Sequence, residues 1–106
     1  MKLLTKALEK RFAALGNQDG KGDDAIVVAK FFNPTGSTTW YATEWIPEDD
    51  VFFGLTDGQF AELGYFSKTE LDGFKGPFGI GIERDLHFGE KTIGEVKKNL
   101  NGISVG

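Results

Sequence analysis

The chain has 106 residues, of which 40% are apolar, with a net charge of −4 and no cysteine. This length fits one domain over residues 1–106 and leaves no room for a second, while the lack of cysteine excludes disulfides, thiolate metal sites and cysteine nucleophiles. The acidic balance, with lysine and arginine scattered along the chain, argues against direct contact with nucleic acid through a basic patch.

The N-terminal segment is expected to form a helix over residues 5–15. Apolar residues recur at a spacing near four from Leu4 to Leu15 and make one apolar face. Thr5 is suited to cap the start of this helix, and Gly16 stands where a left-handed residue would end it. Charged residues interrupt the apolar stretch that a signal peptide or a membrane span needs, so we expect a cytoplasmic protein without membrane contact.

Four strands are expected in the middle of the chain, because runs of β-branched and aromatic residues alternate with turn-forming residues. The first run is almost continuously apolar, which predicts burial on both faces except near Lys30. Short turns between consecutive strands predict an antiparallel meander. The predicted strands are residues 25–33, 38–46, 51–55 and 60–66.

Two capping-box patterns predict the remaining helices. Ser67 with Glu70 opens a short middle helix, and Thr92 with Glu95 opens a C-terminal helix. Between them, residues 80–84 form at most a short edge strand. The expected fold class is therefore α+β, a single antiparallel sheet of about four strands with an N-terminal, a middle and a C-terminal helix packed on it.

The loop after the first helix is rich in glycine and aspartate. It lacks the spacing and the hydroxyl residue of a phosphate-binding loop, and it follows a helix where such a loop follows a strand, so no cofactor is expected. Asp23 and Asp24 raise the question of calcium, but Lys21 falls on a ligand position and would repel a cation. We interpret the segment as a solvated acidic turn without a metal, and Asp23 and Asp24 are the candidate ligands if one binds.

The second predicted strand carries the most suggestive cluster. Strict alternation places Trp40 and Glu44 on one face of the sheet, and Tyr41 and Trp45 on the other. An exposed aromatic row could stack bases or sugars. So small a domain needs its large rings inside, however, and ten phenylalanines and both tryptophans are the main source of its core. Core packing is the preferred interpretation.

No catalytic grouping emerges from the polar residues. Glu44 and Glu62 could meet across strands as an acid–base pair, although no spacing enforces it. In the segment 83–85, Arg84 stands between two carboxylates, which indicates a structural ion pair, with anion recognition as the alternative. A single histidine, His87, excludes a multi-histidine metal site. The candidate binding residues are Trp40, Tyr41, Glu44, Glu62, Arg84 and Asp85.

Several short segments follow one another in a distinctive order. They are Lys2-Leu3-Leu4-Thr5, Gly22-Asp23-Asp24, Lys30-Phe31-Phe32-Asn33-Pro34, Trp40-Tyr41-Ala42-Thr43-Glu44, Pro47-Glu48-Asp49, Phe53-Gly54-Leu55, Glu62-Leu63-Gly64-Tyr65-Phe66-Ser67, Glu70-Leu71 and Ile82-Glu83-Arg84-Asp85. This order resembles the bacterial family catalogued as domain of unknown function 2958 and covers most of the chain. The resemblance implies a bacterial cytoplasmic protein, often carried on plasmids or integrative conjugative elements, and implies no established activity, cofactor or catalytic residue.

We therefore expect a non-enzymatic accessory protein of mobile elements that acts through protein partners, for example against a host defence nuclease. One alternative is a carboxylate-based or metal-dependent enzyme, which would use Asp23, Asp24, Glu44, Glu62 or Asp85. Another is a single-stranded nucleic-acid module that stacks bases on Trp40 and Tyr41. The sequence does not determine an oligomeric state.

Overall fold

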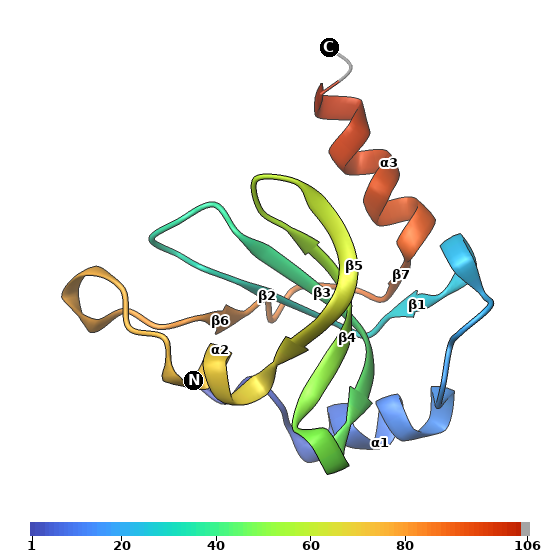
Figure 1. The fold of residues 1–106 in the computed structure, drawn as a ribbon, viewed down its shortest axis with the longest axis horizontal. Helices are drawn as coiled ribbons and strands as arrows, with labels where there is room; N and C mark the ends of the chain where they lie inside the picture. Colours follow the sequence, from blue (N-terminus) through green and yellow to red (C-terminus); the bar gives the residue numbers. More distant parts are fainter. Residues whose placement is uncertain (105–106) are drawn as a thin grey trace.

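A computed structural model describes the backbone of residues 1–104 and the side chains of residues 1–100 (Figure 1). In chain order, the elements are α1 (Lys6–Leu15), η1 (Gly22–Asp24), β1 (Ile26–Val27), β2 (Ala29–Phe32), β3 (Thr39–Ile46), η2 (Pro47–Asp49), β4 (Val51–Asp57), β5 (Ala61–Ser67), α2 (Lys68–Gly73), η3 (Pro77–Gly79), β6 (Glu83–Arg84), β7 (Lys91–Thr92) and α3 (Ile93–Ser104). A five-stranded antiparallel sheet has the order β5-β4-β3-β2-β6, and β1 and β7 form a second, two-stranded sheet.

The helices begin where their capping residues predict. The side chains of Thr5 and Ser67 each accept a hydrogen bond from the backbone N–H three residues further on, at 3.2 and 3.1 Å. At the start of α3, Thr92 and Glu95 cap each other through bonds of 3.1 and 2.9 Å. None of the helices in the described part of the chain combines the length and hydropathy that a membrane span requires.

The α+β class is confirmed, but the prediction of one sheet with about four strands is wrong in its details. The predicted strand 25–33 divides into β1, which pairs with β7, and β2, which pairs with β3 and β6. Both halves are apolar, so the break between them leaves no mark in the residue pattern. Strands β6 and β7 have two residues each, which is too short for any periodicity to show.

The two faces of the large sheet carry two separate hydrophobic cores. The first core includes Phe12 of α1, Phe31 and Phe52 of the sheet, and Leu71 of α2. The second core lies under α3 and includes Tyr41, Leu55, Ile93 and Val96. In Figure 1, α1 and α2 lie in the lower half of the view and α3 rises at the upper right. Helices therefore cover parts of both faces.

A ring cluster centred on Phe52 fills the first core. Its ring centroid lies 5.9 Å from that of Phe12, 5.1 Å from Phe31, 4.9 Å from Trp45 and 5.6 Å from Phe66. These residues come from α1 and from the four adjacent strands β2, β3, β4 and β5 of the large sheet. Burial of one such ring removes roughly 150–250 Å² of surface from water, so this cluster is a main source of the stability of so short a chain.

The buried side chain of Gln18 holds the loop after α1 against the sheet. Only 3% of the residue is exposed. Its amide nitrogen donates to the carbonyl oxygens of Thr43 and Ile26, at 2.7 and 2.9 Å, and its amide oxygen accepts from the N–H of Ile26 at 2.7 Å. This loop, in which the sequence shows only turn-forming residues, is therefore a fixed connection between α1, β1 and β3.

Replacing Gln18 by alanine is expected to lower the free energy of unfolding by about 3 kcal/mol, because three buried or partly buried backbone groups lose their partner together. The measurement is urea denaturation of Gln18→Ala and of Gln59→Ala, which changes an exposed glutamine in the turn after β4. Gln59→Ala should stay within about 0.5 kcal/mol of the parent protein. Equal midpoints for the two variants would contradict the role given to Gln18.

Candidate functional site

A β-bulge in β3 rearranges the aromatic residues that the sequence singles out. The register with β4 shifts between Ala42 and Glu44, so that Thr43 has no partner of its own. The prediction that Trp40 shares a face with Glu44 is therefore wrong. Trp40 and Trp45 both pack against the first core, and Tyr41 lies in the second.

The contacts of these rings confirm that they pack in the two cores. Tyr41 is 8% exposed, its ring lies 6.4 Å from that of Phe88, and the ammonium of Lys30 sits 5.9 Å from the ring centre. Trp40 is half-buried, on the other side of the sheet. Because opposite faces separate Trp40 from Tyr41, the two rings do not make a common stacking surface.

The carboxylates proposed as an acid–base pair lie apart. Glu44 is opposite Phe53, and its carboxylate accepts a hydrogen bond of 3.1 Å from the N–H of Gln18. Glu62 is exposed on β5 and lies opposite Thr56. Thr56 is three residues after Phe53 on β4, so Glu62 lies on the face of the sheet opposite to that of Glu44. The structure thus gives each carboxylate a separate environment.

The acidic turn also has a structural role. Asp23 and Asp24 are exposed on η1, and the carboxylate of Asp23 pairs with Lys97 of α3 at 3.1 Å. Across the described part of the chain, no three histidine, aspartate or glutamate side chains converge as metal ligands would. The pairing with Lys97 attaches this turn to α3.

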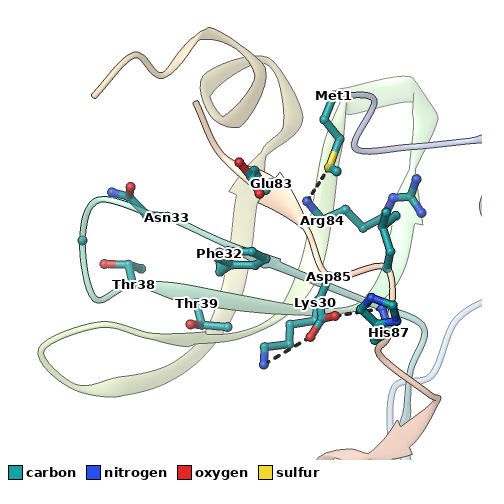
Figure 2. Close-up of a pocket in the computed structure, with 12 residues that line it drawn as sticks. Met1, Lys30, Phe32, Asn33, Thr38, Thr39, Glu83, Arg84, Asp85 and His87 are labelled. Carbon is teal, nitrogen blue, oxygen red and sulfur yellow. Dashed lines mark hydrogen bonds and ion pairs between the residues drawn. The ribbon is translucent and has the colours of Figure 1, made fainter. Parts of the chain in front are cut away.

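Arg84 and Asp85 lie together at one cavity. A cleft of about 510 Å³, the large cleft, opens between the β2–β3 hairpin, β6 and the turn that follows β6 (Figure 2). It is lined by Met1, Lys30, Phe32, Asn33, Gly36, Thr38, Thr39, Glu83, Arg84, Asp85, Leu86 and His87. Figure 2 shows Asn33 and Thr38 at one end of it, and Lys30, Asp85 and His87 gathered at the other.

Asp85 organises the charged end of the large cleft. Its backbone N–H donates to the carbonyl oxygen of Lys30 at 2.9 Å, and one carboxylate oxygen accepts from the N–H of His87 at 2.9 Å. The other oxygen faces the ammonium of Lys30 at 3.6 Å. The ion pair predicted with Arg84 is therefore replaced by one with Lys30. Arg84 instead donates from Nε to the carbonyl oxygen of Lys2 at 3.4 Å.

A second, smaller cavity adjoins the large cleft beneath the start of α3. This small cavity has a volume of about 220 Å³ and shares Lys30, Asp85 and His87 with the large cleft. Its remaining lining comes from Tyr41, Phe88, Gly89, Lys91, Val96 and Asn99. Burial raises the pKa of the Tyr41 phenol, and the carboxylates of Asp57 and Asp85 raise it further, so the phenol keeps its proton at neutral pH.

The edge strand β5 forms a different exposed surface. Among the strands of the described residues it pairs with β4 alone, over seven residues and without a register shift. Leu63 is 53% exposed and Tyr65 is 71% exposed on one face, where the ring of Tyr65 meets that of Phe53 at a centroid distance of 5.0 Å. Phe60, in the turn before β5, is also 71% exposed. We call Phe60, Leu63 and Tyr65 the β5 edge surface.

Sequence reasoning missed much of both sites. From the sequence, Lys30 is only an interruption of an apolar strand and His87 only a structural residue. In the structure, both line the two cavities. The signal for β5 was present, because the last strand of a meander is an edge strand by construction. Exposure of its apolar side chains depends on which helix covers which face, and strand periodicity does not contain that information.

Comparison with known proteins gives a family but no characterised relative. Neither a curated protein nor a solved structure matches the chain. A family model described as "Protein of unknown function (DUF2958)" matches residues 3–96, which include every residue that lines the large cleft except Met1, together with the whole β5 edge surface. The chain therefore belongs to the DUF2958 family of proteins of unknown function.

Proposed function

We propose that this protein is a non-enzymatic binding protein that docks an extended segment of a partner protein along β5. The observation that supports this is an unprotected sheet edge bordered by exposed apolar side chains. A free edge offers a row of backbone N–H and C=O groups to another strand. Proteins usually protect such edges with lysine, proline or a bulge, and β5 contains none of these, its one charged residue being Glu62.

The partner segment is expected to carry apolar residues at alternate positions. Leu63 and Tyr65 point to the same side of the sheet, so a strand added beside β5 would place every second side chain against them. On the opposite side, a basic residue near Glu62 would complete the pairing. The partner is thus recognised through its backbone and through alternating side chains.

The expected setting is the bacterial cytoplasm, with the protein acting as an accessory factor of a mobile element and its partner a protein of the element or of the host. The family resemblance supports this setting, and interference with a host defence nuclease would be one form of it. The proposal uses no catalytic group. It therefore agrees with the separate environments of Glu44 and Glu62.

Changing Tyr65 to lysine is expected to weaken partner binding about tenfold, because a charged chain replaces an aromatic anchor at the centre of the contact. The tagged parent protein and the variant would be expressed at native level in a host that carries the element, and retained proteins identified by mass spectrometry. The affinity of each retained partner is then measured by calorimetry with purified components.

Phe78→Lys is the matched control, since Phe78 is 100% exposed in the loop before β6 and lies outside the β5 edge surface. This variant should bind the partner as the parent protein does. Equal loss of binding in Tyr65→Lys and Phe78→Lys would contradict docking at β5. Recovery of no partner by the parent protein would contradict the binding function itself.

A further inference from the structure

The large cleft and the small cavity meet at a shared wall, formed by Lys30, Asp85 and His87. This wall lies at the β2–β6 edge of the large sheet, and β5 forms the other edge. A ligand that fills both cavities would therefore contact groups that the proposed docking of a partner strand does not use. Binding of such a ligand would be independent of that docking.

The small cavity carries an excess of hydrogen-bond donors and of positive charge. Its lining includes two lysines, Lys30 and Lys91, and one carboxylate, Asp85, while the carboxylate of Asp57 acts on the Tyr41 phenol from outside the lining. The ammonium of Lys30 lies 3.6 Å from Asp85, which is longer than a hydrogen bond, so its three donors remain available within the described part of the chain. The phenol of Tyr41 and the amide of Asn99 add further donors.

The carboxylate of Asp85 is the one acidic group in the lining of the small cavity, and the ammonium of Lys30 offsets its charge. One of its carboxylate oxygens already accepts from the N–H of His87, and the other faces Lys30. The protonated phenol of Tyr41 can donate and carries no charge. One anionic oxygen group placed between Lys30, Lys91 and Tyr41 would thus meet donors on several sides.

The large cleft has a different character. The half-buried ring of Phe32 forms part of its lining, together with the side chains of Thr39 and Leu86. Its volume of about 510 Å³ lies within the range of pockets that hold small organic molecules. Glu83 also lines this cleft and would repel a second anionic group on the ligand, whereas the neighbouring Arg84 directs its Nε to the carbonyl oxygen of Lys2.

We propose that the two cavities together bind a small organic anion, with its single carboxylate or phosphate group held by Lys30 and Lys91 in the small cavity and its apolar or aromatic body lying against Phe32 in the large cleft. Polyanions are a poor fit, because Glu83, Asp85 and the net charge of −4 oppose them. The ligand class is thus a monocarboxylate or monophosphate with an uncharged body.

The test is a titration followed by ¹H–¹⁵N NMR, with phenyl phosphate, benzoate, inorganic phosphate and phenol as separate probes. At least one of the two aromatic anions is expected to cause saturable shifts at residues that line both cavities. It should bind about tenfold more tightly than phenol, which lacks the charge, and phenyl phosphate should likewise exceed inorganic phosphate. Comparison of the affinities for benzoate and phenyl phosphate shows whether the site prefers a carboxylate or a phosphate group.

Lys30→Gln is expected to weaken binding of the aromatic anion about tenfold, through loss of a charged donor. Lys98→Gln, at an exposed lysine of α3 outside both cavities, should leave binding unchanged. Lys91→Gln provides a second test that leaves the Lys30–Asp85 pair intact, and the dispersion of the spectrum reports whether each variant is folded. Absence of saturable shifts with both aromatic anions would overturn the proposal, as would equal binding by Lys30→Gln, Lys91→Gln and Lys98→Gln.

Discussion

Replacing Gly54 by alanine is expected to lower the free energy of unfolding by more than about 3 kcal/mol, or to prevent folding. A methyl group at this position would point into the backbone of β3. It would lie 2.9 Å from the carbonyl carbon of Tyr41, closer still to the carbonyl oxygen, and 3.0 Å from the Cα of Ala42. Backbone atoms in the centre of a sheet cannot move aside without loss of their strand pairing, so the clash has no inexpensive relief.

Gly64→Ala provides the control for this prediction. Gly64 pairs directly with Gly54 across β4 and β5, but an added methyl group there meets nothing within 4 Å. Its unfolding free energy should change by less than about 1 kcal/mol, because alanine only restricts the unfolded chain relative to glycine. Urea denaturation of both variants measures the difference. Similar stabilities would show that β3 does not approach β4 as closely as described.

Phe52→Ala is expected to destabilise the protein by about 3–5 kcal/mol. The ring of Phe52 is completely buried and contacts four other aromatic rings, which α1 and the rest of the sheet hold around it. Truncation leaves a cavity that these rings cannot fill together, since each is fixed by its own backbone. A domain of this size has a total stability of roughly 5–15 kcal/mol, so the loss would be a large part of it.

Phe60→Ala removes a ring of the same size from the β5 edge surface, where 71% of the residue is exposed. Its free energy of unfolding should stay within about 0.5 kcal/mol of that of the parent protein. Thermal and urea denaturation of the two phenylalanine variants compare a core ring with a surface ring directly. A comparable loss of stability in Phe60→Ala would mean that the turn before β5 is packed, and would also weaken the case for docking there.

Aromatic residues are divided between core and surface, whereas composition alone predicts that the large rings lie in the core. Phe12, Phe31 and Phe52 are buried, as a short chain requires. Phe60, Phe74 and Phe78 are exposed, so the aromatic content exceeds what the two cores take up. That surplus is found on the β5 edge surface and in the loop before β6. Exposed rings beside an open strand edge are the physical basis of the proposed docking.

Features that depend on neighbours in the chain could be predicted well. The caps at Thr5, Ser67 and Thr92 lie within three residues of the groups they satisfy, so their hydrogen bonds follow from the local sequence. The α+β class and the antiparallel order of β3, β4 and β5 follow similarly, because short turns leave a strand few other places to pair.

Features that depend on distant contacts could not be predicted. The bulge at Thr43 moves Glu44 and Trp45 to faces opposite to those expected from alternation, because the count of paired residues depends on β4 as well as on β3. Likewise, Lys30 and Asp85 are far apart in the chain and meet only because β6 joins the edge of the sheet at β2.

The sequence by itself determined the α+β class, the starts of the helices and the family, since each depends on residue pattern, on local hydrogen bonds or on residue order. Only the tertiary structure decided the five-stranded order, the open edge at β5 and the paired cavities around Lys30. The physical reason is that the periodicity of apolar and polar residues shows which way each side chain points relative to its neighbours in the chain. What covers that side chain is set by segments that the chain brings in from elsewhere.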